Sequence, residues 1–493
     1  MAVNGELFAG YPTTRVDEAV GPDGRLRNGW AGMAAALERL GSAGLVAAAA
    51  DLGARRRERG VAVSAWVDGR QELRPVPLDP VPRVLDAGTW AALSGGVAQR
   101  HRALNAFLAD VYRPAGRRRG DPDRAAEIVR AGMVPDWPAA HGPGRDPGPV
   151  PRAWPGQPRA TVAAADVVRG ADGRWLVTRD ALQVPSGIGY ALADRESARA
   201  ATPELFAGLG SRLVDPADAV PLLRGALAAA APPACTGAPR IAVLTQGESD
   251  GAWFEHQVLA EALGAPLVRA GDLWPRGDGG VEVAVDGGRL PVDVLYRRFD
   301  DALLGAYPTG VGLPLESGLT EAVRAGRLGL ANVPGNGIAD DAAGYAWVPA
   351  MIRFYLGEEP LLDSARTWVL ADPSAWAAVR DRLHELEVQE VAGYGGRGVV
   401  HGPACSAAEL AALREEIAAA PHRFVAREPV EPSTAPTLVD GVLRPRPVDL
   451  RVFSVAGTTT TTLPVALTRV APEAAPVRVG VPGGGSKDTW LLR

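Results

Sequence analysis

Lysine is almost absent from this sequence of 493 residues: Lys487 is the only lysine among 52 basic residues. Arginine fills nearly every other position that needs a positive charge. The single retained lysine therefore predicts a role that the broader guanidinium of arginine could not fill, such as contact with a phosphate group inside a tight turn.

Cysteine is also scarce, and Cys235 and Cys405 lie far apart in the sequence. They lack the close spacing of metal ligands, so we expect free thiols in a reducing cytosol. Long hydrophobic runs are missing as well: there is no stretch of roughly 18 apolar residues and no apolar N-terminal segment of the kind that directs secretion. We therefore predict a soluble cytoplasmic protein that does not bind a membrane.

The sequence also lacks an excess of positive charge, since its net charge is −5. Such a chain has no electrostatic field that would gather nucleic acid, so a nucleic-acid partner is not expected. The arginine runs at 55–57 and 117–119 are interpreted as solvated surface.

What the sequence does contain is a high hydrophobic fraction of 47%, enough for sizeable cores. Residues 240–332 alternate between short apolar strands and helical segments, a pattern typical of a parallel α/β sheet. Ligands of such sheets gather at the carboxyl ends of the strands. The polar residues expected at those ends are Gln246, Glu248, Asp300, Asp301 and Asn332.

Two glycine-rich stretches follow in the last third of the chain. The first, 393–398, contains Gly395, Gly396 and Arg397 between two predicted strands, and the second contains Gly483, Gly484 and Gly485 just before Lys487. Glycines let a backbone approach a ligand closely and point its N–H groups at an anion. The second stretch is expected to bring Lys487 to a phosphate group, and its alternative is a flexible tail.

Together these segments resemble the circularly permuted type 2 ATP-grasp family, from about residue 79 to 493. The residues that carry the resemblance include, in order, Gln99, Arg100, Asn105, Asp110, Asp166, Arg169, Pro185, Ser186, Gly187, Phe254, Glu255, His256, Arg297, Arg298, Asp300, Asp301, Asn332, Asn336, Asp340, Asp341, Glu358, Asp449, Arg451 and the stretch 483–490. Each motif alone is weak, but their order together is specific.

The resemblance implies an α/β, ATP-grasp fold and an ATP-dependent carboxylate–amine ligase related to glutathione and glutathionylspermidine synthetases. It divides the chain into an N-terminal extension (1–78), the N-terminal part of the permuted ATP-grasp region (79–235), an α/β domain that precedes the grasp (236–366) and a nucleotide-binding part (367–493). The expected partners are a small-molecule carboxylate and an amine or peptide, and ATP is the expected cofactor.

Site residues follow from the same motifs, with alternatives left open. Catalytic roles are expected for Arg298, Asp449 and Arg451, although Asp449 and Arg451, which alternate on one strand, could instead form an internal ion pair. Asp300 and Asp301 could bind Mg²⁺ or cap a turn. The backbone at Glu428 and Val430 would hold adenine.

Several positions depart from the family pattern. Where the family reads Glu-Asp-Asn, with a Glu and an Asn that resemble magnesium ligands, this chain has Arg179, Asp180 and Ala181. Gln389 and Ala342 stand where the family has lysine. We therefore expect Mg²⁺ to be held weakly. A ligase, an inactive ATP-grasp protein that serves as a binding or scaffold subunit for a protein partner, and a phosphotransferase all stay open.

Overall fold

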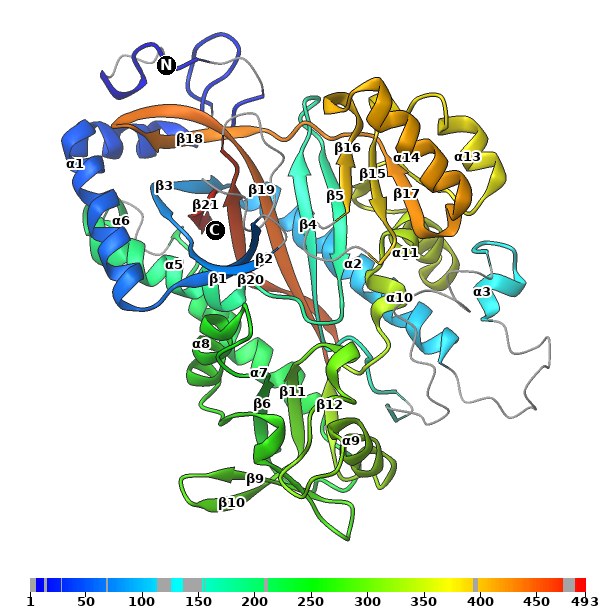
Figure 1. Cartoon of the computed structure of the whole chain (residues 1–493). Helices are drawn as coiled ribbons and strands as arrows, with labels where there is room; N and C mark the ends of the chain where they lie inside the picture. Colours follow the sequence, from blue (N-terminus) through cyan, green and yellow to red (C-terminus); the bar gives the residue numbers. More distant parts are fainter. Residues whose placement is uncertain are drawn as a thin grey trace.

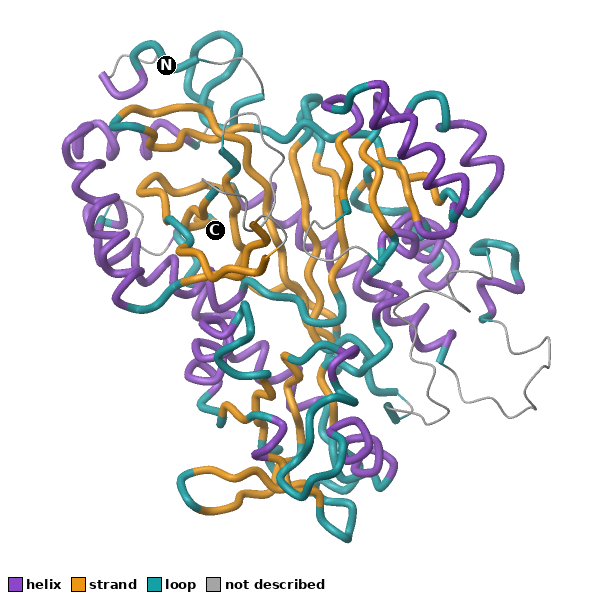
Figure 2. The backbone as a smooth tube through the Cα atoms, in the orientation of Figure 1, coloured by secondary structure: helices purple, strands orange, loops and turns teal. Residues whose placement is uncertain are grey.

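The computed structural model describes residues 6–12, 16–27, 29–67, 70–112, 126–135, 153–154, 156–207, 212–392, 398–472 and 484–493. A long central sheet runs through the molecule, with a smaller sheet beside one edge and a third, parallel sheet at one end (Figure 1). Figure 2 shows how helices surround these strands. The expected α/β fold is confirmed.

The central sheet is built from strands of both halves of the chain. Its order is β13-β5-β4-β19-β20-β21-β3, and β18 pairs with the outer part of β19. The bounds are β3 (Leu78–Leu85), β4 (Val162–Arg169), β5 (Trp175–Ala181), β13 (Asp363–Ser364), β18 (Thr434–Val439), β19 (Val442–Ala456), β20 (Thr460–Val470) and β21 (Gly485–Leu491). Most neighbours are antiparallel, whereas β21 runs parallel to β3 and β13 parallel to β5.

Each face of the central sheet packs differently. Helix α2 (Ala87–Val111) covers one face, where Leu93 and Val97 meet Val167, Leu450 and Val452. The other face carries α5 (Ile188–Ala201) and α7 (Ala219–Ala229) over its inner end. Because side chains alternate along a strand, the residues next to Leu450 and Val452 point away from α2.

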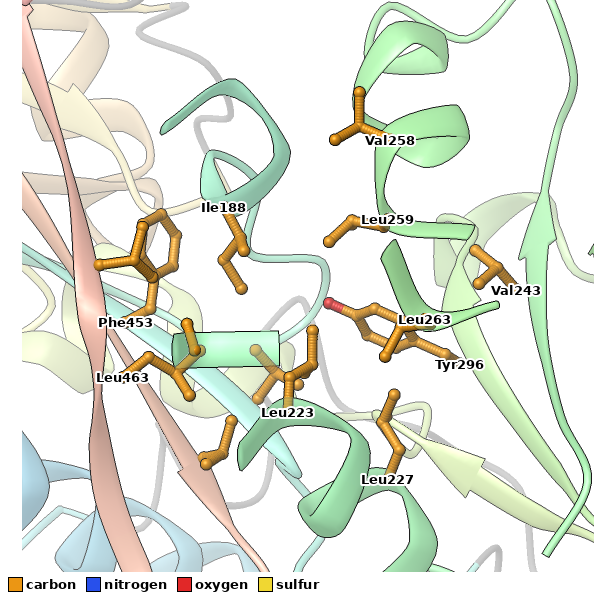
Figure 3. Close-up of a cluster of buried hydrophobic side chains, with 14 of the residues drawn as sticks. Ile188, Leu223, Leu227, Val243, Val258, Leu259, Leu263, Tyr296, Phe453 and Leu463 are labelled. Carbon is orange, nitrogen blue, oxygen red and sulfur yellow. The ribbon is translucent and has the colours of Figure 1, made fainter. Parts of the chain in front are cut away.

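The parallel sheet predicted for 240–332 is confirmed. Its order is β12-β11-β6-β7, with strands β6 (Ile241–Thr245), β7 (Leu267–Val268), β11 (Val294–Arg298) and β12 (Gly329–Ala331). Helices α8 (Trp253–Leu263) and α9 (Leu315–Arg324) and the strands β8 (Leu273–Pro275), β9 (Val281–Val285) and β10 (Gly288–Val292) complete this α/β lobe. The lobe joins the central sheet through one core, in which Phe453 and Leu463 face Leu259 and Tyr296 across Leu223 (Figure 3).

The small sheet has the order β14-β17-β15-β16, all antiparallel. Its strands are β14 (Thr367–Val369), β15 (Glu387–Glu390), β16 (Val399–His401) and β17 (Phe424–Arg427). Helices α13 (Pro373–Val379) and α14 (Ala407–Ala419) cover one face through Val388, Phe424 and Ala426. On the opposite face, Val425 packs against Ala343 of α11 (Ala342–Ala346).

The N-terminal part wraps the edge of the central sheet. It comprises a turn at Glu6–Phe8, α1 (Trp30–Glu58), β1 (Ala62–Val67) and β2 (Arg70–Pro75). Helix α1 is long and apolar enough to cross a membrane, but one such helix is only weak evidence for a membrane span. Trp30, Met33 and Leu37 of α1 instead pack with Val81 and Trp490 in one core.

The remaining helices in the described ranges are short. They are α3 (Glu127–Arg130), α6 (Pro203–Phe206), α10 (Gly337–Asp340), α12 (Val348–Met351), a π-helical turn at Ile352–Leu356, and single 3₁₀ turns at Pro216–Asp218, Ala270–Asp272, Asp301–Leu303, Leu383–Glu385, Gly402–Ala404 and Pro421–Arg423.

Candidate functional site

Charged side chains lie in a row on the face of the central sheet that points away from α2. Arg451 on β19 lies opposite Asp166 on β4, and Asp166 lies opposite Arg179 on β5. Asp449, two residues before Arg451 on β19, lies opposite Arg469 of β20, the next strand of the sheet. Directly opposed residues of antiparallel strands share a face, so these five side chains form one surface, called here the charged face.

The inner part of the charged face is a closed network of ion pairs. The Arg451 guanidinium holds both oxygens of Asp166, at 2.7 and 2.8 Å, and Arg469 pairs with Asp449 and reaches Asp166 at 3.1 Å. Burial alone would raise the pKa of the Asp166 carboxyl, but the charges of Arg451 and Arg469 outweigh it and hold that pKa below its usual value. Burial raises the pKa of Asp449 in spite of Arg469. Asp449 and Arg451 are thus both in ion pairs, but Asp449 pairs with Arg469 and Arg451 pairs with Asp166.

A tight loop before α5 closes over the charged face. Arg451 donates to the Ser186 carbonyl oxygen at 2.9 Å. From the end of β11, Arg298 donates to the carbonyl oxygen of Pro185 at 2.8 Å and to the hydroxyl oxygen of Ser186 at 2.7 Å. Arg298, expected to be catalytic, is almost completely buried. Its position indicates that it fixes this loop between the central sheet and the α/β lobe.

The buried Glu255 of α8 anchors the same loop. One carboxylate oxygen accepts the backbone N–H groups of Gly187 at 2.5 Å and Gly189 at 3.1 Å, and the other lies 3.5 Å from Arg298. A side chain on Gly187 would meet the Phe453 ring at 2.7 Å, and its φ of 133° disfavours other residues. The family motif at 185–187 therefore builds a rigid corner rather than a mobile lid.

The small sheet touches β5 next to Arg179. Arg427 at the end of β17 donates to the Thr178 carbonyl oxygen at 2.9 Å and pairs with Glu387 of β15 at 2.8 Å. Gln389 follows two residues after Glu387 and so lies on the same face of β15. We call this contact region, formed by Thr178, Arg179, Glu387 and Arg427, the junction.

Beyond the junction the strand leads to the predicted adenine contacts. The Glu428 amide donates to the Arg366 carbonyl oxygen at 3.1 Å, and the Glu428 carboxylate lies 3.7 Å from the Arg366 guanidinium. Val430 is half-buried in the segment that follows. Gly395, Gly396 and Arg397 fall outside the described residues, and Gly398 closes the hairpin with a φ of 67°.

The turn between α10 and α11 completes the junction. The Asp340 carboxylate accepts the amides of Leu182 and Gln183 at 2.7 and 2.8 Å and lies 3.3 Å from the Arg179 guanidinium. Asp341 caps α11 through the Gly344 amide, and burial raises the pKa of its carboxyl to about 8. This turn therefore places Asp340 next to Arg179, the cation that departs from the family pattern.

The predicted metal ligands Asp300 and Asp301 have structural partners. Asp300 caps the turn that follows β11 by accepting the Ala302 amide at 3.0 Å. Asp301 pairs with Arg297 at 2.5 Å and accepts the Gly335 amide at 2.8 Å. Asp300 thus caps a turn, which was the alternative to metal binding, and Asp301 forms an ion pair with Arg297.

Lys487, predicted to bind phosphate, has protein partners within the central sheet. Because Arg469 lies opposite Ser486 in the sheet, the next residue, Lys487, points to the opposite face from Arg469. Its ammonium is fully buried, 2.5 Å from Asp79, and donates to the carbonyl oxygens of Val81 and Pro436 at 3.1 and 2.8 Å. These contacts use all three hydrogens of an ammonium group.

The glycines before Lys487 belong to the same structural element. Gly485 begins β21, where a side chain would meet the Pro77 carbonyl oxygen at 2.7 Å. Gly484 is half-buried, and Gly483 lies outside the described residues. Close strand packing therefore explains Gly485 without a ligand.

Sequence reasoning missed Arg469 and Arg427. Arg469 is a buried cation near the end of β20, and Arg427 is a half-buried cation at the end of β17. A charge that is removed from water requires a partner. That signal marks the residues but does not reveal which carboxylates they meet.

Comparisons with known proteins agree with this architecture. Residues 82–471 match the family described as circularly permuted ATP-grasp type 2. A glutathione synthetase-like effector from Globodera pallida, solved in apo form, has the same fold with a TM-score of 0.53 and 10% identity, over 90% of this chain and 96% of that one.

Sequence relatives extend over nearly the whole chain. A Frankia alni protein with the provisional name glutamate–cysteine ligase 2-3 is 45% identical over 489 residues, which are 99% of this chain and 55% of the relative. An uncharacterized protein of Mycobacterium tuberculosis is 38% identical over 497 residues, 99% of this chain and 86% of the relative. The chain thus spans only 55% of the length of the Frankia alni relative. Because the family model matches residues 82–471, which are most of the chain, the chain belongs to the circularly permuted type 2 ATP-grasp family.

Proposed function

We propose that this chain binds ATP at the junction and acts as an ATP-dependent carboxylate–amine ligase. The observation that carries the proposal is the charged face itself: Arg179 lies beside Thr178, where Arg427 ties the small sheet to the central sheet. Arg451 and Arg469 continue the same face on β19 and β20, and both reach Asp166. Guanidinium groups fixed in a partly buried site are well suited to bind phosphate oxygens and to stabilise the charge that develops during phosphoryl transfer.

The proposed reaction has two steps. A carboxylate oxygen of the first substrate attacks the γ-phosphorus of ATP, the bond to the β-phosphate oxygen breaks, and ADP leaves. The amine of the second substrate then attacks the acyl carbon, inorganic phosphate leaves with the bonding electrons, and the amine nitrogen loses a proton. Fixed cations stabilise both the transferring phosphoryl group and the departing phosphate.

The provisional name of the Frankia alni relative suggests a first substrate pair. We propose glutamate as the carboxylate and cysteine as the amine. The test is release of ADP by the purified protein with ATP, glutamate and cysteine together, and mass spectrometry of the amide product. ADP release that requires both amino acids supports the proposal, and failure of the protein to bind ATP at all would refute it.

Arg427 offers a matched pair of variants for that assay. Arg427→Gln removes the cation that ties the small sheet to β5, whereas Arg423→Gln removes an exposed cation paired with Glu390 at the start of the same strand. The loss of a charge-assisted contact should raise the KM for ATP on the order of tenfold in Arg427→Gln only. Arg427→Lys, which keeps the charge, should restore part of the affinity.

A binding protein without turnover is the second candidate. It is favoured by the charged face, where Asp166 and Asp449 are held by arginines. Under this alternative the wild type binds ATP, but ADP release stays at background with every carboxylate and amine tried. The scaffold role for a protein partner belongs to this alternative.

A further inference from the structure

The carboxylates of the charged face and the junction are a poor fit for Mg²⁺, which ATP-grasp ligases use in general. Mg²⁺ requires near-octahedral oxygen ligands with free lone pairs. Asp166 is bound by Arg451 and Arg469, Asp449 by Arg469, and Asp340 by two amides and Arg179. Within the ranges that the structure describes, no group of three or more His, Cys, Asp or Glu side chains is arranged to hold a metal ion.

We infer that Arg179 is a built-in cation of the nucleotide site, which contacts the phosphates of a nucleoside triphosphate and makes its binding independent of a divalent metal ion. This inference rests on the proposed function, because it assigns the charge that the ATP site would use. It also explains the departure from the family pattern, in which a glutamate stands at this position.

The charge balance supports the exchange. A glutamate that holds Mg²⁺ has a net charge of +1, and so does an arginine at the same position. The guanidinium also presents paired N–H donors that match two phosphate oxygens directly. A hydrated metal ion contacts phosphate oxygens only through its coordination shell. The replacement of Glu by Arg thus keeps the local charge while it removes the site for the ion.

The position of Arg179 fits this role better than those of its neighbours. Its side chain is 32% exposed, against 11% for Arg451 and 10% for Arg469. It shares the charged face with Arg451 through Asp166, and Thr178 beside it is the point where Arg427 attaches the small sheet. Arg179 is therefore the most exposed of these three arginines.

The ion pair of Arg179 with Asp340 is also longer, at 3.3 Å, than the bidentate ion pair of Arg451 with Asp166, at 2.7 and 2.8 Å. When Arg179 moves, Asp340 keeps the hydrogen bonds from the Leu182 and Gln183 amides. Movement of Arg451 would instead take from the buried Asp166 carboxylate the cation that holds both of its oxygens.

The test is calorimetric titration of the purified chain with ATP, once with EDTA and once with excess Mg²⁺. For the wild type we expect dissociation constants in the two buffers that agree within about threefold. Arg179→Gln should weaken binding in EDTA by roughly ten- to a hundredfold, the loss expected for one charge-assisted contact to phosphate. Arg174→Gln, which removes an exposed arginine just before β5, is the matched control and should bind as the wild type does.

A second variant makes the outcome independent of the first. Arg179→Glu together with Ala181→Asn restores the acid and amide of the family pattern, and should bind ATP only when Mg²⁺ is present. Circular dichroism of all variants checks that they fold.

The results separate this inference from the proposed function. Wild-type binding that requires Mg²⁺ would overturn the inference and leave the ligase proposal standing. Binding in EDTA that Arg179→Gln does not weaken would also overturn it, because another group then supplies the charge. Absence of ATP binding in both buffers would overturn both.

Discussion

Replacement of Lys487 by methionine tests whether this lone lysine holds the fold together or holds a phosphate. Methionine keeps the length of the side chain but removes the charge and all three hydrogen bonds of the ammonium. The Asp79 carboxylate, of which only 8% is exposed, then loses its cation. It keeps two backbone donors, from Val81 at 3.0 Å and Leu438 at 2.8 Å.

The magnitude follows from those contacts. Removal of one partner from a buried ion pair costs about 3–5 kcal/mol, because the other charge remains uncompensated. The two backbone donors of Asp79 reduce that cost, while the carbonyl oxygens of Val81 and Pro436, left without their donor, add to it. We expect a loss of about 3–5 kcal/mol, which for a cooperative unit of 150–250 residues lowers the midpoint of thermal unfolding by roughly 6–20 °C.

The assay is thermal unfolding followed by circular dichroism, together with ATP titration of the folded variant. Lys487→Met combined with Asp79→Asn should recover part of the loss, because the buried charge is removed as well. An unchanged midpoint for Lys487→Met, with ATP affinity reduced on the order of tenfold or more, would refute this reasoning and restore the phosphate-binding role.

Further predictions concern the junction and the loop above the charged face. Because burial raises the pKa of Asp341 to about 8, the folded protein keeps a proton there that the unfolded chain loses, so stability should fall as pH rises from about 4 to 8. Asp341→Asn should remove this dependence and be more stable than the wild type at pH 8, in denaturant titrations at several pH values. Gly187→Ala should destabilise by about 1–3 kcal/mol, because of its positive φ and the Phe453 ring, as measured by the shift in urea midpoint. Glu255→Gln leaves Arg298 buried without its carboxylate and should cost about 3–5 kcal/mol in the same assay, whereas Glu248→Gln, at an exposed pair, should change it little.

Local patterns predicted the elements well. The parallel sheet of the α/β lobe follows from short apolar strands separated by helices, and the hairpin at Asp286 and Gly287 follows from a turn sequence that tolerates positive φ. The family could be identified because its motifs keep their order along the chain. These signals lie within short windows, where periodicity and turn chemistry determine the structure.

Partners across the sheets could not be predicted in the same way. Asp449 and Arg451 share a face, as their spacing indicates, but their partners Arg469 and Asp166 depend on the register of β19 with β20 and β4. The ion pair of Lys487 with Asp79 could not be predicted for the same reason, because a shift of one residue in β21 decides which face of the sheet a side chain occupies. Register comes from pairing between distant segments, which a single sequence does not display.

The place of β21 in the central sheet has a consequence for synthesis of the chain. Strand β3 pairs with β21, and residues as distant as Asp79 and Lys487 are direct neighbours there. On the ribosome, β3 must wait until β21 has emerged before the two strands can pair. Until then α1, which packs on β3, has an incomplete surface to cover. Until β21 is synthesised, the nascent chain thus exposes an apolar helix and a strand that lacks this partner. This is the condition in which chaperones bind and premature association occurs.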